Sequence, residues 1–130
     1  MDEKVIKYYR ILLKTGFIHS GSIKNPSIFL DAGSDARICA AGNHMQLYID
    51  VVEKTINDIK YSCFCDPNMN VAVEILCTLI KGKSLDEADS IPEQEFYHFL
   101  GSDSEELQKK VKGLKELLKV GISRYKTQLS

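Results

Sequence analysis

The sequence contains no tryptophan, and its six tyrosines and five phenylalanines are scattered along the chain. It therefore offers no visible aromatic platform on which nucleotide bases could stack. The net charge is only −1 at pH 7, which excludes a nucleic-acid binder that relies on charge alone. We accordingly expect no nucleic-acid partner.

Cysteine is also scarce: four residues in a chain of 130 are too few for a disulfide scaffold. The first residues lack the basic start and apolar stretch of a secretory signal. The longest apolar block, Val71–Ile80, contains Glu74 and is about half the length of a membrane span. We expect a cytoplasmic protein, or a mitochondrial matrix protein if the source is eukaryotic, with reduced thiols and no membrane partner.

The length supports a single domain that covers residues 1–130. A chain of this size buries roughly two-thirds of its unfolded surface, which is enough for a hydrophobic core. The hydrophobic content of 44% and the low net charge argue against intrinsic disorder.

A helix is predicted over Asp2–Thr15, because apolar residues recur there at helical spacing and basic residues lie largely on the other face. Gly16 marks its end, and Phe17–Pro26 has the composition of a loop. The expected inner face of this helix holds Val5, Ile6, Tyr9, Leu12 and Leu13.

The middle of the chain has the pattern of antiparallel strands. Ser27–Leu30 is short and apolar, and Arg37–Ala40 either pairs with it or extends it. His44–Val52 alternates between apolar and polar residues, which is typical of a half-buried strand. Lys54–Phe64 follows directly, and the polar pair Glu53-Lys54 between the two strands indicates a hairpin.

The remaining segments are predicted to be helical. Asn68–Lys81 is apolar nearly all round, so we expect it to be buried. Ser84 caps a short acidic helix, and another helix runs from Pro92 to Leu100. The last helix, Ser102–Lys126, has an apolar stripe of Leu107, Val111, Leu114, Leu118, Ile122 and Tyr125, with Lys109, Lys110, Lys112, Lys115 and Lys119 mainly outside it. This order predicts an α+β fold, with a three-stranded antiparallel sheet and helices packed on one face.

Three cysteines are candidate metal ligands. Cys63 and Cys65 place both sulfurs on one face of a strand, about 7 Å apart along it. If Cys39 lies at a neighbouring strand end, three thiolates converge there, and Asp66 or His44 completes a set for zinc or iron. The alternative is that these cysteines are small buried hydrophobic residues, because a single Cys-x-Cys is a weak metal signal.

The other sequence patterns give weaker evidence for a functional site. Gly82-Lys83-Ser84 is similar to the end of a phosphate-binding loop, but Cys77 stands where the first glycine is required, so a nucleotide site is rejected. Cys77 itself is expected in the core. The three histidines form no catalytic pattern and are expected to be exposed or partly buried with partners. The lysines of residues 109–119 are expected to form a solvated face, the alternative being a surface for an acidic partner protein.

Several segments together resemble one known family. The sharpest is the KGKSLDEA sequence of Lys81–Ala88, which in that family follows the helix after the second cluster cysteine. Weaker matches are the opening helix (Glu3–Ile6 with Tyr9), the strands Met45–Ile49 and Ile59–Tyr61, and the end of the last helix, Ile122–Lys126. Over most of residues 2–126 the chain therefore resembles the IscU/NifU-type iron–sulfur cluster assembly scaffolds, which have the fold expected above.

The resemblance implies a [2Fe–2S] cluster held by three cysteines with help from an aspartate and sometimes a histidine. Here the aligned positions differ: Ala41 and Asp66 stand at the first two cysteines, and Asn43 stands at the aspartate. Lys110 stands at the third cysteine, with Lys109 at its histidine neighbour. We predict that these residues cluster, and that Asp66 forms an ion pair with one of the two lysines.

Two functions follow from the resemblance, neither of them enzymatic. In the first, the protein is a scaffold that binds iron, zinc or a labile iron–sulfur cluster through a displaced set of Cys39, Cys63, Cys65 and Asp66, and passes it on. In the second, it is a pseudo-scaffold without metal that binds a cysteine desulfurase or a sister scaffold and modulates cluster assembly. The resemblance implies an iron–sulfur cluster or iron as cofactor and a cysteine desulfurase and other assembly proteins as partners. Zinc is the less demanding metal, since two thiolates with Asp66 and a water, or with His44, form an acceptable set.

Overall fold

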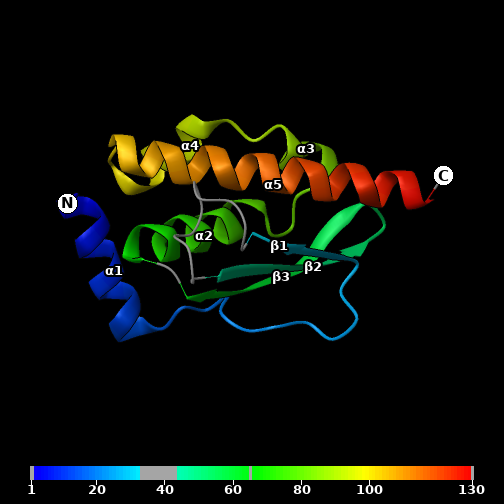
Figure 1. Cartoon of the computed structure of the whole chain (residues 1–130), viewed down its shortest axis with the longest axis horizontal. Helices are drawn as coiled ribbons and strands as arrows, with labels where there is room; N and C mark the ends of the chain where they lie inside the picture. Colours follow the sequence, from blue (N-terminus) through cyan, green and yellow to red (C-terminus); the bar gives the residue numbers. More distant parts are fainter. Residues whose placement is uncertain (1, 33–43, 65, 130) are drawn as a thin grey trace.

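The computed structural model describes residues 2–32, 44–64 and 66–129. Along the chain the elements are α1 (Glu3–Thr15), β1 (Ile28–Asp31), β2 (His44–Val52), β3 (Thr55–Phe64), α2 (Pro67–Ile80), α3 (Leu85–Asp89), α4 (Glu93–Leu100) and α5 (Glu105–Leu129). Figure 1 shows the long helix α5 running across the molecule, above α2 and the sheet.

The three strands form an antiparallel sheet in the order β1-β2-β3. Glu53 and Lys54 connect β2 to β3, and both have positive φ values, of 50° and 63°. Two consecutive residues with positive φ are typical of the tight hairpin turn whose twist matches that of the strands. The expected hairpin is therefore confirmed, while Arg37–Ala40 lies outside the described residues.

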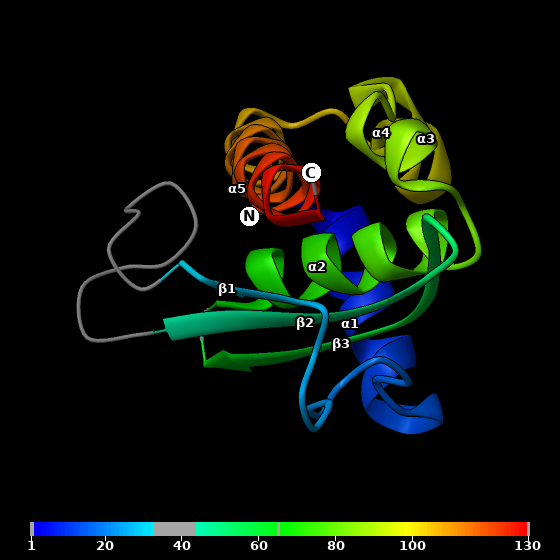
Figure 2. The same cartoon turned by 90° about the vertical axis from the view of Figure 1, so that its right-hand side faces the viewer.

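Helices α2, α3, α4 and α5 lie on one face of the sheet, as expected, whereas α1 lies beside the sheet and extends past it (Figure 2). Met45, Leu47 and Ile49 of β2 point into the core on this face, beneath an α2 that is almost entirely buried. Helix α5 approaches β1 closely at Gly121, where a Cβ atom would lie 2.7 Å from Cδ2 of Leu30. A glycine therefore lets these two elements pack together.

The expected helices are present with small shifts at their ends. Ser84 caps α3 with the predicted capping box, in which its hydroxyl accepts from the Glu87 N–H and the Glu87 carboxylate accepts from the Ser84 N–H. Among residues 2–32, 44–64 and 66–129, no helix is long and apolar enough to cross a lipid bilayer.

The inner face expected for α1 is partly wrong. Val5 and Leu12 are buried, but Leu13 is 60% exposed and Ile6 is only half-buried. The reason is that α1 lies against α2 and α4 at one end of the sheet, so the helix buries a narrow stripe. The apolar residues at the edges of that stripe remain accessible.

Candidate functional site

The candidate site lies where β3 ends and α2 begins. Asp66 is the N-cap of α2, and its Oδ1 accepts a hydrogen bond of 2.9 Å from the backbone N–H of Met69. Pro67 follows in the first turn, where its missing N–H leaves no helical hydrogen bond unmade. The cap therefore fixes the position of the Asp66 carboxylate at this end of the helix.

The second carboxylate oxygen of Asp66 faces α5. Its Oδ2 lies 3.4 Å from Nζ of Lys110, which confirms the predicted ion pair. Lys109, the other lysine considered for this pair, is exposed.

Lys110 is buried, contrary to the expectation that it lies mainly outside the apolar stripe of the last helix. Its side chain is only 10% exposed. Position 110 is three residues after Leu107 and next to Val111, so it lies at the edge of the stripe that packs on α2. A buried ammonium is costly unless a charge or a hydrogen-bond acceptor compensates it, and Asp66 supplies such a group.

Of the candidate cysteines, the structure places Cys63. It pairs with Met45 across β2 and β3, so its side chain is on the sheet face that the helices cover, where it is half-buried. Cys39 and Cys65 lie outside the described residues, so the displaced ligand set stays a hypothesis. Ala41 and Asn43 also lie outside them, so their predicted clustering with Asp66 and the two lysines stays a prediction. Cys77 is fully buried, and burial raises the pKa of its thiol, which agrees with a core position.

His44 and Cys63 lie on opposite faces of the sheet. Successive residues of a strand point to opposite faces, so His44 lies on the face away from Met45 and Cys63. There its ring packs on that of Phe64, with the centroids 4.9 Å apart. Of the two groups considered as completing a thiolate set with Cys63, Asp66 rather than His44 is therefore near the helix-covered side of the sheet.

The described residues do not by themselves fit a metal or a cluster. Within ranges 2–32, 44–64 and 66–129, no group of three or more His, Cys, Asp or Glu side chains could hold a metal ion. Lys110 places a positive charge at the position where the resemblance to IscU/NifU-type scaffolds implies the third cluster cysteine. Asn68, two residues after Asp66, is buried, and its Oδ1 has no hydrogen-bond partner among the described residues.

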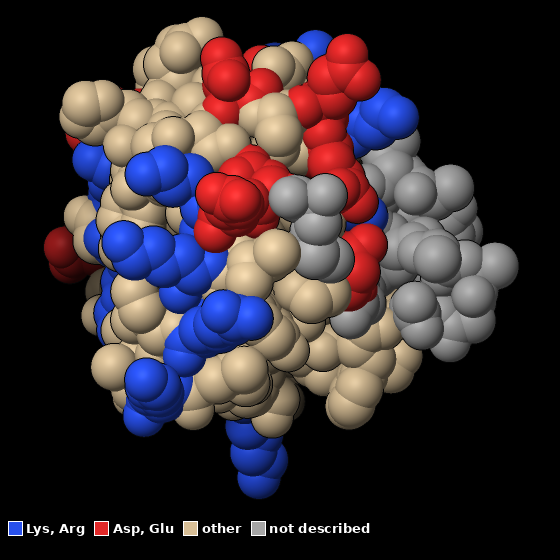
Figure 3. Space-filling model, turned by 90° about the vertical axis from the view of Figure 1, so that its left-hand side faces the viewer, with Lys and Arg blue, Asp and Glu red and all other residues tan. Residues whose placement is uncertain are grey.

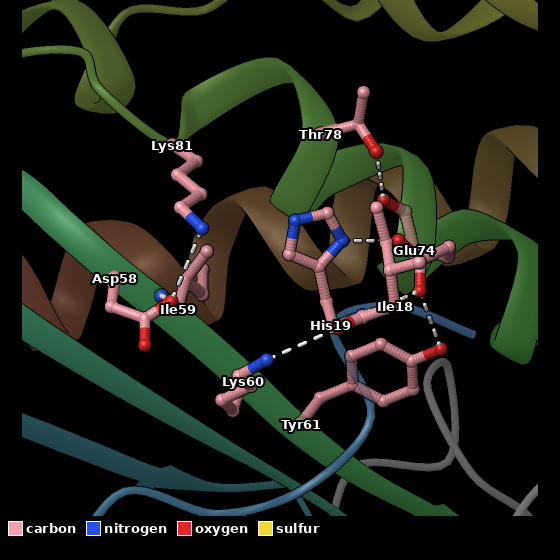
Figure 4. Close-up of polar contacts among 9 residues, drawn as sticks. All are labelled: Ile18, His19, Asp58, Ile59, Lys60, Tyr61, Glu74, Thr78 and Lys81. Atoms are coloured by element: carbon pink, nitrogen blue, oxygen red, sulfur yellow. Dashed lines mark hydrogen bonds and ion pairs between the residues drawn. The ribbon is translucent and has the colours of Figure 1, made fainter. Parts of the chain in front are cut away.

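A second polar cluster lies in the core, where Glu74 of α2 meets Tyr61 of β3 and His19 of the segment after α1 (Figure 4). Glu74 is only 1% exposed, and its Oε2 is paired with Nδ1 of His19. Its Oε1 accepts hydrogen bonds of 3.2 Å from the His19 backbone N–H and from the Tyr61 hydroxyl. Burial and the charge of Glu74 together raise the pKa of Tyr61, so this hydroxyl stays protonated and donates a hydrogen bond to the carboxylate.

This cluster attaches the segment after α1 to the edge of β3. The Tyr61 N–H donates to the His19 carbonyl at 2.9 Å, and the Gly21 N–H donates to the Tyr61 carbonyl at 2.8 Å. Lys60 Nζ donates to the Ile18 carbonyl at 3.1 Å (Figure 4). His19 was expected to be either exposed or partly buried with a partner; it has a partner, Glu74, but it is buried rather than partly buried. The available signal was a single glutamate within an apolar helix.

Comparisons with known proteins agree with this architecture. The model of the family described as NifU-like N terminal domain matches residues 3–130. A crystal structure of a putative iron–sulfur cluster assembly scaffold protein for the SUF system, from Fervidobacterium islandicum AW-1, is similar with a TM-score of 0.67 and 16% identity. That match covers 94% of this chain and 96% of the other.

A second similar structure is the N-terminal part of a nitrogen-fixing NifU-like protein from Brucella abortus, with a TM-score of 0.67 and 12% identity. The match covers 97% of this chain and 94% of the other. No curated protein matches the sequence. At such identities the two structures establish the three-stranded antiparallel α+β fold alone.

Proposed function

The chain belongs to the family of NifU-like N-terminal domains, and from this premise we propose that it is a pseudo-scaffold of iron–sulfur cluster assembly. In this role it is not an enzyme and holds no conventional cluster. It binds a cysteine desulfurase or a sister scaffold in the cytoplasm and modulates cluster assembly.

The ion pair of Asp66 and Lys110 carries this proposal. Both residues stand at positions where the resemblance to IscU/NifU-type scaffolds places cluster cysteines. A [2Fe–2S] cluster requires four ligands, which are typically thiolates. An ammonium group 3.4 Å from the carboxylate instead neutralises Asp66 and repels an incoming cation. The pair joins α5 to the start of α2, so these helices are connected without a metal.

Reconstitution tests the cluster half of the proposal. The protein is incubated anaerobically with iron and sulfide, and its visible absorption and bound iron are measured after desalting. We expect no stable cluster. A brown protein with thiolate-to-iron absorption and about two iron atoms per chain would contradict the proposal, since that is the content of a [2Fe–2S] centre.

The partner half is tested by measuring binding to a purified cysteine desulfurase and the rate of sulfide release by that enzyme. We expect saturable binding that changes the rate both in the presence and in the absence of added iron. Absence of binding to both the desulfurase and a cluster-competent scaffold would contradict the docking role.

A labile metal site is the second candidate, with Cys39, Cys63, Cys65 and Asp66 as ligands. Two observations favour it: Cys63 is on the helix-covered face close in sequence to Asp66, and the buried Asn68 Oδ1 lacks a partner among the described residues. Zinc accepts two thiolates with an oxygen ligand and a water.

Competition with a coloured chelator measures this zinc affinity. Cys39→Ala and Cys65→Ala should abolish binding, whereas Cys77→Ala, which alters only the core, is the control. Binding that survives loss of either candidate cysteine would exclude this site.

A further inference from the structure

Two shallow grooves of opposite charge lie next to each other at one end of the molecule. The first, of about 560 Å³, runs along the outward face of α1 and is lined by Lys7, Arg10 and Lys14 together with Ile6 and Ile11. Glu3 is the single acidic residue in its lining. This groove is therefore basic, with apolar side chains between the charges.

The second groove, of about 660 Å³, is formed by α4 and the turn that leads to α5. Its charged carboxylates are Glu95 and Asp103, both exposed, and its backbone bends at Pro92 and Gly101. Lysine and arginine are absent from its lining among the described residues. This groove is therefore acidic.

Contacts between α1 and α4 fix the two grooves side by side. The rings of Tyr8 and Phe99 meet edge to face, with centroids 5.7 Å apart. The hydroxyl of Ser102 donates a hydrogen bond to the carboxylate of Asp2, the N-cap of α1. Figure 3 views this end of the molecule and shows basic side chains gathered along one side and acidic side chains gathered beside them.

The boundary between the grooves is apolar and accessible. Phe99 is 41% exposed although it packs on Tyr8, and Ile11 in the neighbouring basic groove is 45% exposed. Protein interfaces characteristically combine exposed aromatic and aliphatic side chains at the centre with charged groups at the rim. The arrangement here has this form, with Phe99 between two rims of opposite sign.

We propose that this surface binds a second copy of the same chain in a two-fold symmetric dimer. In a two-fold interface each patch of one protomer contacts a patch of its partner, and the same contact occurs twice. A basic and an acidic groove on one face are complementary under such a rotation. Each α1 then faces the α4–α5 turn of the partner, and the two Phe99 rings lie near the axis.

Charge complementarity selects this occupant over another protein, because both halves of the match are present on the same face. The overall charge of −1 adds little general repulsion between copies. The proposal is independent of the metal question, since none of the residues involved is a candidate ligand.

Charge reversal in each groove tests the dimer, with sedimentation equilibrium from micromolar to millimolar concentrations as the measurement. We expect a dimer that weakens with added salt, since exposed charges are screened. Lys7→Glu/Arg10→Glu and Glu95→Lys/Asp103→Lys should each raise the dissociation constant by at least about tenfold, because like charges then face each other. Lys119→Glu/Arg124→Glu, on the distant half of α5, is the matched control and should leave it unchanged. Thermal melts establish that each variant is folded.

Mixing the two reversed variants provides the decisive step. In a dimer of one variant with the other, both contacts join opposite charges again, so the mixture should form heterodimers although each variant alone is monomeric. A wild-type protein that stays monomeric at millimolar concentration would overturn the proposal. So would reversed variants that dimerise like the wild type, or a mixture that remains monomeric. Binding of the surface only to a different protein would identify another occupant and equally exclude this one.

Discussion

Asp66 makes two different interactions with its two carboxylate oxygens: Oδ1 caps α2 through the Met69 N–H, and Oδ2 lies 3.4 Å from Nζ of the buried Lys110. One side chain therefore both begins a helix and joins it to α5. Its removal differs from removal of Lys110, because only the first also destroys a cap.

We predict that Asp66→Ala lowers the free energy of unfolding by about 2 to 3 kcal/mol, because the helix cap and the charge facing Lys110 are lost together. Asp66→Asn keeps an oxygen for the cap and should cost only about 1 kcal/mol. Lys110→Met should be within about 1 kcal/mol of wild type, since an apolar chain of similar length fills the same space. Urea unfolding measures all three. Equal losses for Asp66→Ala and Asp66→Asn would show that the cap contributes nothing.

A second prediction concerns the buried cluster around Glu74. His19→Ala removes the ring that pairs with this carboxylate and should cost about 2 kcal/mol. It should also accelerate hydrogen exchange at the amides of Gly21 and Tyr61, which bond the segment after α1 to β3. His44→Ala, on the opposite face of the sheet, is the control. Unchanged exchange at Gly21 and Tyr61 would mean that backbone pairing alone holds this segment.

Alkaline pH should destabilise the protein. Burial and the charge of Glu74 raise the pKa of Tyr61, and burial with Glu93 raises that of Tyr97 to about 12. In the unfolded chain these tyrosines ionise near pH 10, so above that pH the unfolded state binds fewer protons than the folded state. Stability therefore falls as pH rises from about 10 to about 12, that is, from the unfolded tyrosine pKa to the folded pKa of Tyr97. Urea unfolding across this range should give a shallower decline for Tyr61→Phe, and an identical decline would remove Tyr61 as its cause.

The elements were predictable from local patterns because each pattern reflects which face is buried. Alternation in His44–Val52 and the apolar residues of α2 are such signals, and both elements formed. Leu13 was expected on the buried face of α1 but is exposed, because the stripe that α1 buries is narrower than its run of apolar residues. Burial of Lys110 depends on how α5 lies against α2, which periodicity within one helix does not determine.

Of the polar contacts at and near the candidate site, one was predictable from the sequence and another was not. The pair of Asp66 and Lys110 was predictable only because resemblance to a known family placed both residues at one site. Glu74 and His19 are 55 positions apart, and nothing local in either segment indicates the other. Such pairs arise from tertiary packing, whereas a lone glutamate in an apolar helix signals only that some partner exists.

Cysteines at the three family positions should give the surroundings of Asp66 and Lys110 a strong affinity for zinc. In the triple variant Ala41→Cys/Asp66→Cys/Lys110→Cys, three thiols stand at the family positions and the ammonium is removed. We expect zinc affinity to rise by at least about a hundredfold over wild type, because thiolates are strong zinc ligands. Binding should weaken below about pH 6, as protons compete for the sulfurs. Chelator competition measures the affinity. The matched serine triple variant removes the same charges without adding thiols and should show no gain. If the cysteine variant folds but binds no better than the serine variant, then the arrangement around α2 and α5, and not only its ligands, has departed from a metal site.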